Sequence, residues 1–141
     1  MKNPFFILIC ILTFTSFTSL FAQQKTDAYK LALGDYKESE KEMNTTYNKI
    51  LKSYAGDAEF VKRLKESQRI WLLSRDADLE MIFPEHKSKP GEYGQGLSTC
   101  KIWELKDMTD QRIDFLNQWV DGVDEGTDCA GSRKATGEDG D

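Results

Sequence analysis

Apolar residues recur at intervals of three and four along three stretches of the chain, which is the spacing of one helical face. In the first stretch these positions are Tyr29, Leu33, Tyr36, Met43, Tyr47, Ile50 and Tyr54. Lys and Glu fill the other faces, as on a solvated helix surface. The pattern predicts an amphipathic helix from Asp27 to Tyr54, ended by Gly56, with Asp57 as the cap of the next helix.

The second stretch predicts a helix over residues 58–83, because Pro84 lacks the amide hydrogen that a continuing helix needs. Prolines and glycines crowd residues 84–97, which indicates a long loop. A third helix is expected over 98–120, where one stripe holds Leu105, Met108, Arg112, Leu116 and Trp119. The predicted fold is all-α: an antiparallel bundle of three long helices with a long loop before the last one.

Polar residues interrupt the apolar face of the second helix. Gln68 and Arg75 lie one turn on either side of Trp71, and a buried polar group must find a partner. Arg75 can lie over the indole ring and donate two hydrogen bonds to a carboxylate on another helix. On the third helix, Arg112 is likewise a cation within an apolar face.

These positions support two interpretations, which the residues alone leave open. One is a ligand-binding or partner-binding polar site; the other is a buried arginine network that fixes how the helices pack. The candidate residues are Gln68, Trp71, Arg75, Asp76, Thr109 and Arg112. The candidate anionic partners are Asp76, Asp78 and Glu40.

The N-terminal residues 1–22 have the pattern of a secretory signal peptide: Lys2, an apolar run from Phe5 to Leu12, and small residues up to Ala22. Cleavage leaves a chain without stable membrane insertion, whereas an uncleaved signal would act as an anchor. We expect an exported protein, periplasmic or extracellular. The expected organisation is a signal at 1–22, one helical domain at 23–120 and a largely disordered tail at 121–141.

Charge is unevenly distributed. Residues 23–120 hold 16 basic and 17 acidic residues, whereas residues 121–141 hold seven acidic and two basic ones. No basic region dominates, so nucleic acid is not expected as a partner. The acidity of the mature chain is concentrated in its tail.

The residues form no recognisable catalytic or metal-binding pattern. His86 is the only histidine and lies in a loop between two prolines, and a catalytic pair with Cys100 would need a reduced thiol in an oxidising compartment. Asp121, Asp124, Glu125 and Asp128 lack the alternation of ligands and glycine that a calcium loop requires. We therefore expect no catalytic residues, no metal, no cofactor and no enzymatic activity.

Two cysteines, Cys100 and Cys129, follow the signal region. In an oxidising compartment a disulfide between them is plausible. It would close a loop of roughly 30 residues and contribute about 3 kcal/mol in the chain-entropy model. Two unpaired thiols, or a bridge between molecules, are the alternatives.

A combination of residues resembles the bacterial lysozyme-inhibitor-like (LprI-type) domain family. The combination comprises Met43, Asn44, Tyr47, Leu64, Lys65, Glu66, Ser67, Gln68, Arg69, Trp71, Arg75, Asp76, Ala77, Cys100, Met108, Thr109, Arg112 and Leu116. The resemblance covers most of residues 27–119 and implies a small, helical, cysteine-stapled, exported domain. The function that the resemblance implies is inhibition of lysozyme in some members of the family and is unassigned in most.

The chain departs from that family pattern in its cysteines. Asp78 stands where the family usually has a Cys, and the region near the mature N-terminus has none. Cys100 has therefore lost its expected partner, and Cys129 is the substitute that the chain offers.

The function expected from the sequence is non-enzymatic binding of a protein partner, with lysozyme the most concrete one. Inhibition would place the acidic tail or the 84–97 loop in the cleft of a muramidase, whose chemistry depends on two carboxylates. The alternative is a structural or adaptor module of the cell envelope that binds another exported protein, a peptide or a glycan. The oligomeric state is not specified by the sequence.

Overall fold

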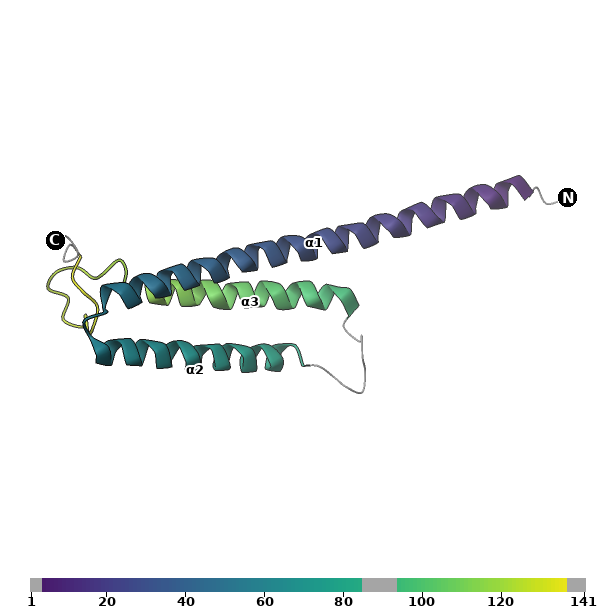
Figure 1. The fold of residues 1–141 in the computed structure, drawn as a ribbon. Helices are drawn as coiled ribbons and strands as arrows, with labels where there is room; N and C mark the ends of the chain where they lie inside the picture. Colours follow the sequence, from purple (N-terminus) through teal and green to yellow (C-terminus); the bar gives the residue numbers. More distant parts are fainter. Residues whose placement is uncertain (1–3, 85–93, 137–141) are drawn as a thin grey trace.

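The structure is a computed structural model. It describes the backbone of residues 4–84 and 94–136, and the side chains of 27–84 and 97–136. These residues contain three helices. They are α1 (Pro4–Ser53), α2 (Ala58–Ile82) and α3 (Gly94–Asn117). Each helix runs opposite to the one before it (Figure 1). The described residues form no strand, only an isolated bridge. The predicted all-α antiparallel bundle is confirmed.

The helix boundaries agree best with the sequence where a specific residue ends or starts a helix. The Asp57 carboxylate accepts the Phe60 amide at 2.9 Å and caps α2. The other two helices extend further back than expected: α1 begins at Pro4 instead of Asp27, and α3 at Gly94 instead of Ser98. The end of α3 at Asn117 precedes the expected one. Most of the expected 84–97 loop lies outside the described residues.

Small hydroxyl residues line the contact between α1 and α3. Ser39 and Thr46 on α1 and Thr109 on α3 are all buried. Two of the hydroxyls are satisfied across the contact: Thr46 donates to Asn117 Oδ1 at 3.4 Å, and Ser39 hydrogen-bonds the Asp110 carboxylate. Buried hydroxyls of this kind carry little desolvation cost, and their small size brings the two helices close together.

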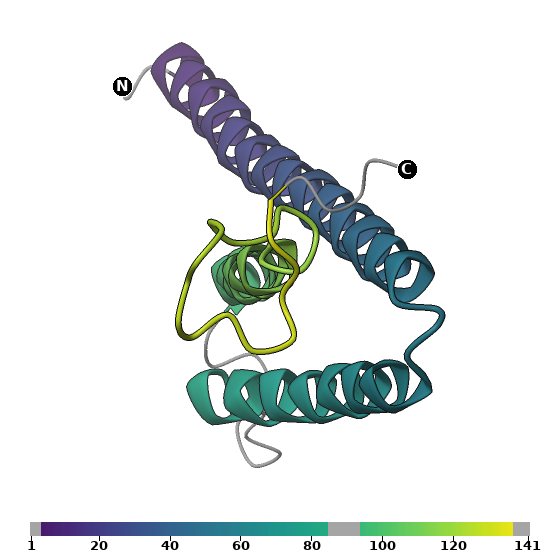
Figure 2. The same ribbon diagram turned by 90° about the vertical axis from the view of Figure 1, so that its left-hand side faces the viewer.

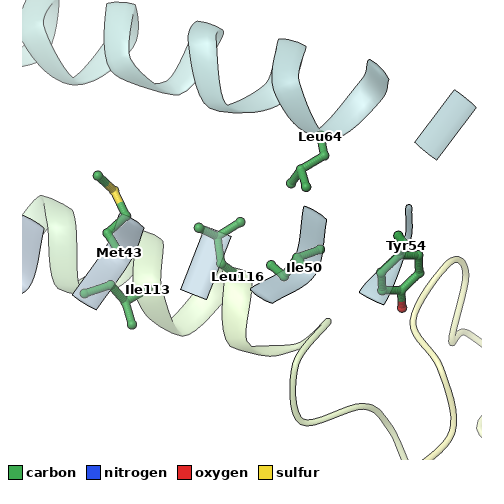
Figure 3. Packing of buried hydrophobic residues seen from close by; sticks show 6 residues of the cluster. All are labelled: Met43, Ile50, Tyr54, Leu64, Ile113 and Leu116. Carbon is green, nitrogen blue, oxygen red and sulfur yellow. The ribbon is translucent and has the colours of Figure 1, made fainter. Parts of the chain in front are cut away.

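The hydrophobic core lies where the C-terminal halves of α1 and α3 meet the start of α2 (Figure 3). Its buried members are Met43, Ile50, Tyr54, Leu64, Ile113 and Leu116. Leu64 is the one residue of this set that comes from α2, whose only other buried residue is Leu79. In the end-on view α3 lies beside α1 while α2 stands further off (Figure 2). α2 is thus the least firmly packed of the three helices.

The segment after α3 folds back on the helices instead of extending into solvent. Ser132 accepts hydrogen bonds at 3.0 Å from the Tyr54 hydroxyl, through its carbonyl, and from the Trp119 indole, through its hydroxyl. Val123 pairs with Ala135 in the isolated bridge. Residues 121–136 follow a path of turns beside the helices, and residues 137–141 lie outside the described part. The prediction that the tail is largely disordered stays a prediction.

Among the described residues, no helix combines the length and the apolar character needed to cross a membrane.

Candidate binding site between the second and third helices

A pocket of about 400 Å³, called the Trp71 pocket below, opens between α2 and α3. Its lining comes from one face of each helix: Trp71, Ser74, Arg75 and Asp78 of α2, and Met108, Gln111, Arg112 and Phe115 of α3. Residues three and four apart share a helical face, so the two helices present these side chains to each other. The pocket therefore collects side chains from two segments that are distant in the sequence.

The indole of Trp71 is the centre of the arrangement. The Cζ atom of Arg75 lies 5.3 Å from the ring centroid, and that of Arg112 lies 5.6 Å from it. Arg112 also lies over the Phe115 ring, at 5.0 Å. Cation–π contacts of this length contribute about 0.5–1 kcal/mol each at exposed sites and more when water is excluded. The aromatic rings thus hold two guanidinium groups at the pocket.

Arg112 is buried, with 8% of its surface exposed, and its hydrogen-bond partners are neutral. Its Nε donates to Gln68 Oε1 and its Nη2 to Ser67 Oγ, both at 3.0 Å. Burial lowers the pKa of Arg112, because loss of water disfavours the charged form. Within the described residues no carboxylate forms an ion pair with it. The structure therefore holds a buried cation by amide, hydroxyl and aromatic groups.

Arg75 obtains its carboxylate from its own helix. Its Nε and Nη2 both donate to Asp76 Oδ1, at 3.0 and 2.7 Å. The Arg75 side chain is 12% exposed, whereas that of Asp76 is 63% exposed. The expectation of a partner on another helix is thus not met. The other two candidate carboxylates accept hydrogen bonds from hydroxyl groups: Glu40 from Tyr36, and Asp78 from Ser74.

The structure brings four of the six candidate residues together: Gln68, Trp71, Arg75 and Arg112. Asp76 lies at the edge of this group as the partner of Arg75. Thr109 does not belong to it, since it is fully buried and donates to the Leu105 carbonyl of its own helix at 2.7 Å.

Two residues that contribute to the site were not among the six candidate residues. Ser67 supplies an acceptor for Arg112, and Phe115 supplies a second aromatic wall. Phe115 could have been found, because it follows Arg112 by three residues and so shares its helical face. Ser67 is among the residues that carry the family resemblance, but no helical spacing assigns it to the site, since its contact with Arg112 depends on how α2 is aligned against α3.

The expected disulfide is not formed, and both thiols are free and exposed. Cys100 lies near the start of α3, roughly 25 Å along the helix from its end at Asn117. Cys129 lies beside that end, because Arg133 bonds both the Cys129 carbonyl and the Gln118 side chain. A disulfide requires Cα atoms within about 7 Å. The two cysteines are therefore at opposite ends of α3, and the prediction of a pair within one chain is corrected.

Two further pockets flank α3. One, of about 440 Å³ between α2 and α3, is mainly apolar and shares Phe115 with the site above. The other, of about 330 Å³ between α1 and α3, is acidic and is lined by Asp35, Glu38, Ser39, Glu42, Lys106, Asp110, Ile113 and Asp114. In the described part of the chain no group of three or more His, Cys, Asp or Glu is placed to hold a metal ion.

The family model described as lysozyme inhibitor LprI matches residues 21–116. The chain belongs to the LprI family. No curated protein and no solved structure matches it. The LprI match includes every residue that lines the Trp71 pocket, whereas the folded-back tail lies beyond it. The shared part of this LprI protein is thus the helical bundle.

Proposed function

We propose that this chain is an exported, non-enzymatic protein that binds and inhibits a lysozyme-type muramidase. The observation that carries the proposal is the match of residues 21–116 to the lysozyme inhibitor LprI family. Export rests on the signal-like residues 1–22 of the sequence, with cleavage expected after Ala22. Sequencing the N-terminus of the protein recovered outside the cytoplasm would test this part, because export by cleavage requires the chain to begin at Gln23.

The acidic pocket between α1 and α3 supports a cationic partner. Five carboxylates line it, from Asp35, Glu38, Glu42, Asp110 and Asp114, against the single ammonium group of Lys106. Opposite charge on two surfaces speeds their encounter and fixes their orientation, and the effect weakens as salt increases. The folded bundle therefore offers an anionic surface of its own, in addition to the acidic tail that the sequence points to.

The test is the rate of cell-wall hydrolysis by several lysozyme types, measured with and without the purified protein at low and physiological salt. Dose-dependent inhibition that weakens with salt is expected. Absence of inhibition by a large molar excess of the protein, for every lysozyme tested, would refute the proposal.

A pair of matched variants locates the contact. Glu38→Gln with Glu42→Gln removes two exposed charges from the acidic pocket, while Asp124→Asn with Glu125→Gln removes two exposed charges from the tail. We expect only the first pair to reduce inhibition. Equal losses from both pairs would indicate a dependence on net charge alone, and a loss confined to the second pair would assign the contact to the tail.

The exposed face of α2 favours a second candidate, an adaptor that binds another exported protein. Ile70, Leu73 and Met81 recur on the outer side of this helix, and the last two are 59% and 74% exposed. Exposed apolar residues that share one face are typical of protein contacts. Leu73→Ser with Met81→Ser should abolish capture of a partner by the adaptor and leave muramidase inhibition unchanged.

A further inference from the structure

We propose that the pocket between α2 and α3 binds an organic carboxylate with a compact apolar body. Two guanidinium groups, from Arg75 and Arg112, line this pocket together with the aromatic rings of Trp71 and Phe115. The site does not coincide with the acidic pocket between α1 and α3, so it is independent of the proposed muramidase contact.

The two guanidinium groups of the pocket differ in their anionic partners. Arg75 is paired with Asp76 at the edge of the pocket, whereas Arg112 has no carboxylate partner among the described residues, although the Asp78 carboxylate lines the pocket. A buried cation held by neutral groups has lost its hydration without gaining an anion. An anion placed in the pocket restores this interaction for Arg112, whose described partners are only Gln68, Ser67 and the two rings.

Both guanidinium groups retain donors for a ligand. A guanidinium has five N–H donors. The hydrogen bonds of Arg112 and of Arg75 go out from Nε and Nη2, so Nη1 takes part in none of those described. Arginine prefers planar oxygen pairs, which a carboxylate provides and which permit two parallel hydrogen bonds. The geometry thus favours a carboxylate over a spherical anion.

The remaining walls define the body of the ligand. Trp71, Met108 and Phe115 offer apolar surface next to the charged groups. The volume of about 400 Å³ is near the lower end of the range for small-molecule sites, about 300–1,000 Å³. The ligand is therefore a small acid, either a free organic acid or the C-terminal residue of a peptide, which present the same chemistry.

Benzoate is the probe for this proposal, and benzamide is its uncharged match. In ¹H–¹⁵N spectra of the purified protein, the indole signal of Trp71 is expected to shift saturably with benzoate and not with benzamide. The indoles of Trp103 and Trp119, which do not line this pocket, serve as internal references. Equal shifts with both probes, shifts reproduced by chloride, or no saturable shift up to the solubility of benzoate would each overturn the proposal.

Two arginine variants of α2 separate the pocket from a general charge effect. Arg75→Gln removes a pocket guanidinium and is expected to weaken benzoate binding about tenfold, the effect of one lost charge-assisted hydrogen bond. Arg69→Gln makes the same change at an exposed arginine paired with Glu66, outside the pocket, and is expected to leave binding unchanged. Equal weakening by both variants would contradict the assignment.

A third variant tests the pocket without Arg75→Gln, in case that replacement disturbs the fold. Arg112→Lys keeps the positive charge but loses the planar fork, and we expect weaker benzoate binding with the helical circular dichroism unchanged. Undiminished binding in this variant would exclude Arg112 and overturn the proposal.

A pair of peptides distinguishes the two sources of carboxylate. A short peptide ending in a free C-terminal phenylalanine is compared with the same peptide as its amide. Tighter binding of the free peptide than of benzoate assigns the pocket to chain ends, and tighter binding of benzoate assigns it to free acids. Absence of binding by both the free peptide and benzoate would overturn the proposal.

Discussion

Replacing Gln68 by leucine tests whether Arg112 depends on its neutral partners for stability. Gln68 Oε1 accepts the Nε–H of a guanidinium that is 8% exposed, so its removal leaves that buried donor with no acceptor in the described structure. A hydrogen bond to a charged group is worth about 1.5–3 kcal/mol, and an unsatisfied buried group adds to the loss. We expect Gln68→Leu to lower the free energy of unfolding by about 2–3 kcal/mol.

The companion variant Arg112→Met should cost less, because it removes the buried charge together with its need for acceptors. It forfeits the contacts with Trp71 and Phe115, about 1–2 kcal/mol together. Once Arg112 is replaced by methionine, no guanidinium requires an acceptor at position 68, so adding Gln68→Leu should cost little more. The coupling energy between the two positions is therefore expected to be about 2 kcal/mol.

Urea unfolding followed by circular dichroism at 25 °C measures all four proteins of this cycle. Gln111→Leu is the control, because it makes the same change at an exposed residue of α3 and should stay within about 0.5 kcal/mol of the parent. Costs at Gln68 and Arg112 that add to within about 0.5 kcal/mol would refute the argument, since they would show that the two side chains do not depend on each other.

Three other predictions concern packing, backbone and pH. Leu116 is fully buried in the core, so Leu116→Ala should lower the free energy of unfolding by about 2–5 kcal/mol in the same urea assay. Gly122 has φ 77°, and a Cβ added there would lie 2.8 Å from the Lys134 carbonyl oxygen. At Gly126, where φ is 84°, an added Cβ would have no atom of a non-neighbouring residue within 4 Å. Gly122→Ala should therefore speed proteolysis of the tail more than Gly126→Ala. Equal proteolysis of the two variants would contradict the clash. Burial, together with a hydrogen bond to a neighbouring carboxylate, raises the pKa of Tyr36 from 10.0 to about 12. The stability that depends on its neutral hydroxyl is therefore fully present below pH 10 and is lost as the pH rises from about 10 to about 12. Thermal unfolding across this range should show a steeper decline for the parent than for Tyr36→Phe, and identical slopes would refute this.

The sequence predicted the elements whose limits are fixed by local chemistry. Asp57 and Pro84 mark the limits of α2 because capping and the missing proline amide act on adjacent residues. The start of α3 was misplaced, since Gly94 and Gly96 are typical of loops but are tolerated in the first turn of a helix, where the amides have no intrahelical partner. The common face of Gln68, Trp71 and Arg75 also followed from local spacing.

What the sequence could not predict depends on contacts between distant segments. That Arg112 is satisfied by Gln68 and Ser67, and not by a carboxylate, follows from the alignment of α2 against α3, which spacing within one helix does not reveal. The tail is anchored by Tyr54 and Ser132, which are 78 residues apart. The sequence gives no sign of this contact, because no local pattern identifies an acceptor so far along the chain.

The uneven packing of the three helices has a consequence for hydrogen exchange. α2 contributes only two buried residues, Leu64 and Leu79, and is joined to the rest at its start by a short turn. Segments with few buried apolar contacts open at a lower free energy than the whole protein. The amides of α2 should therefore exchange with solvent earlier than those in the paired part of α1 and α3. One wall of the Trp71 pocket thus belongs to the helix that opens most easily, and an acid that binds only the closed form would slow exchange along α2 by a factor of 1 + [L]/Kd, where [L] is the concentration of free acid.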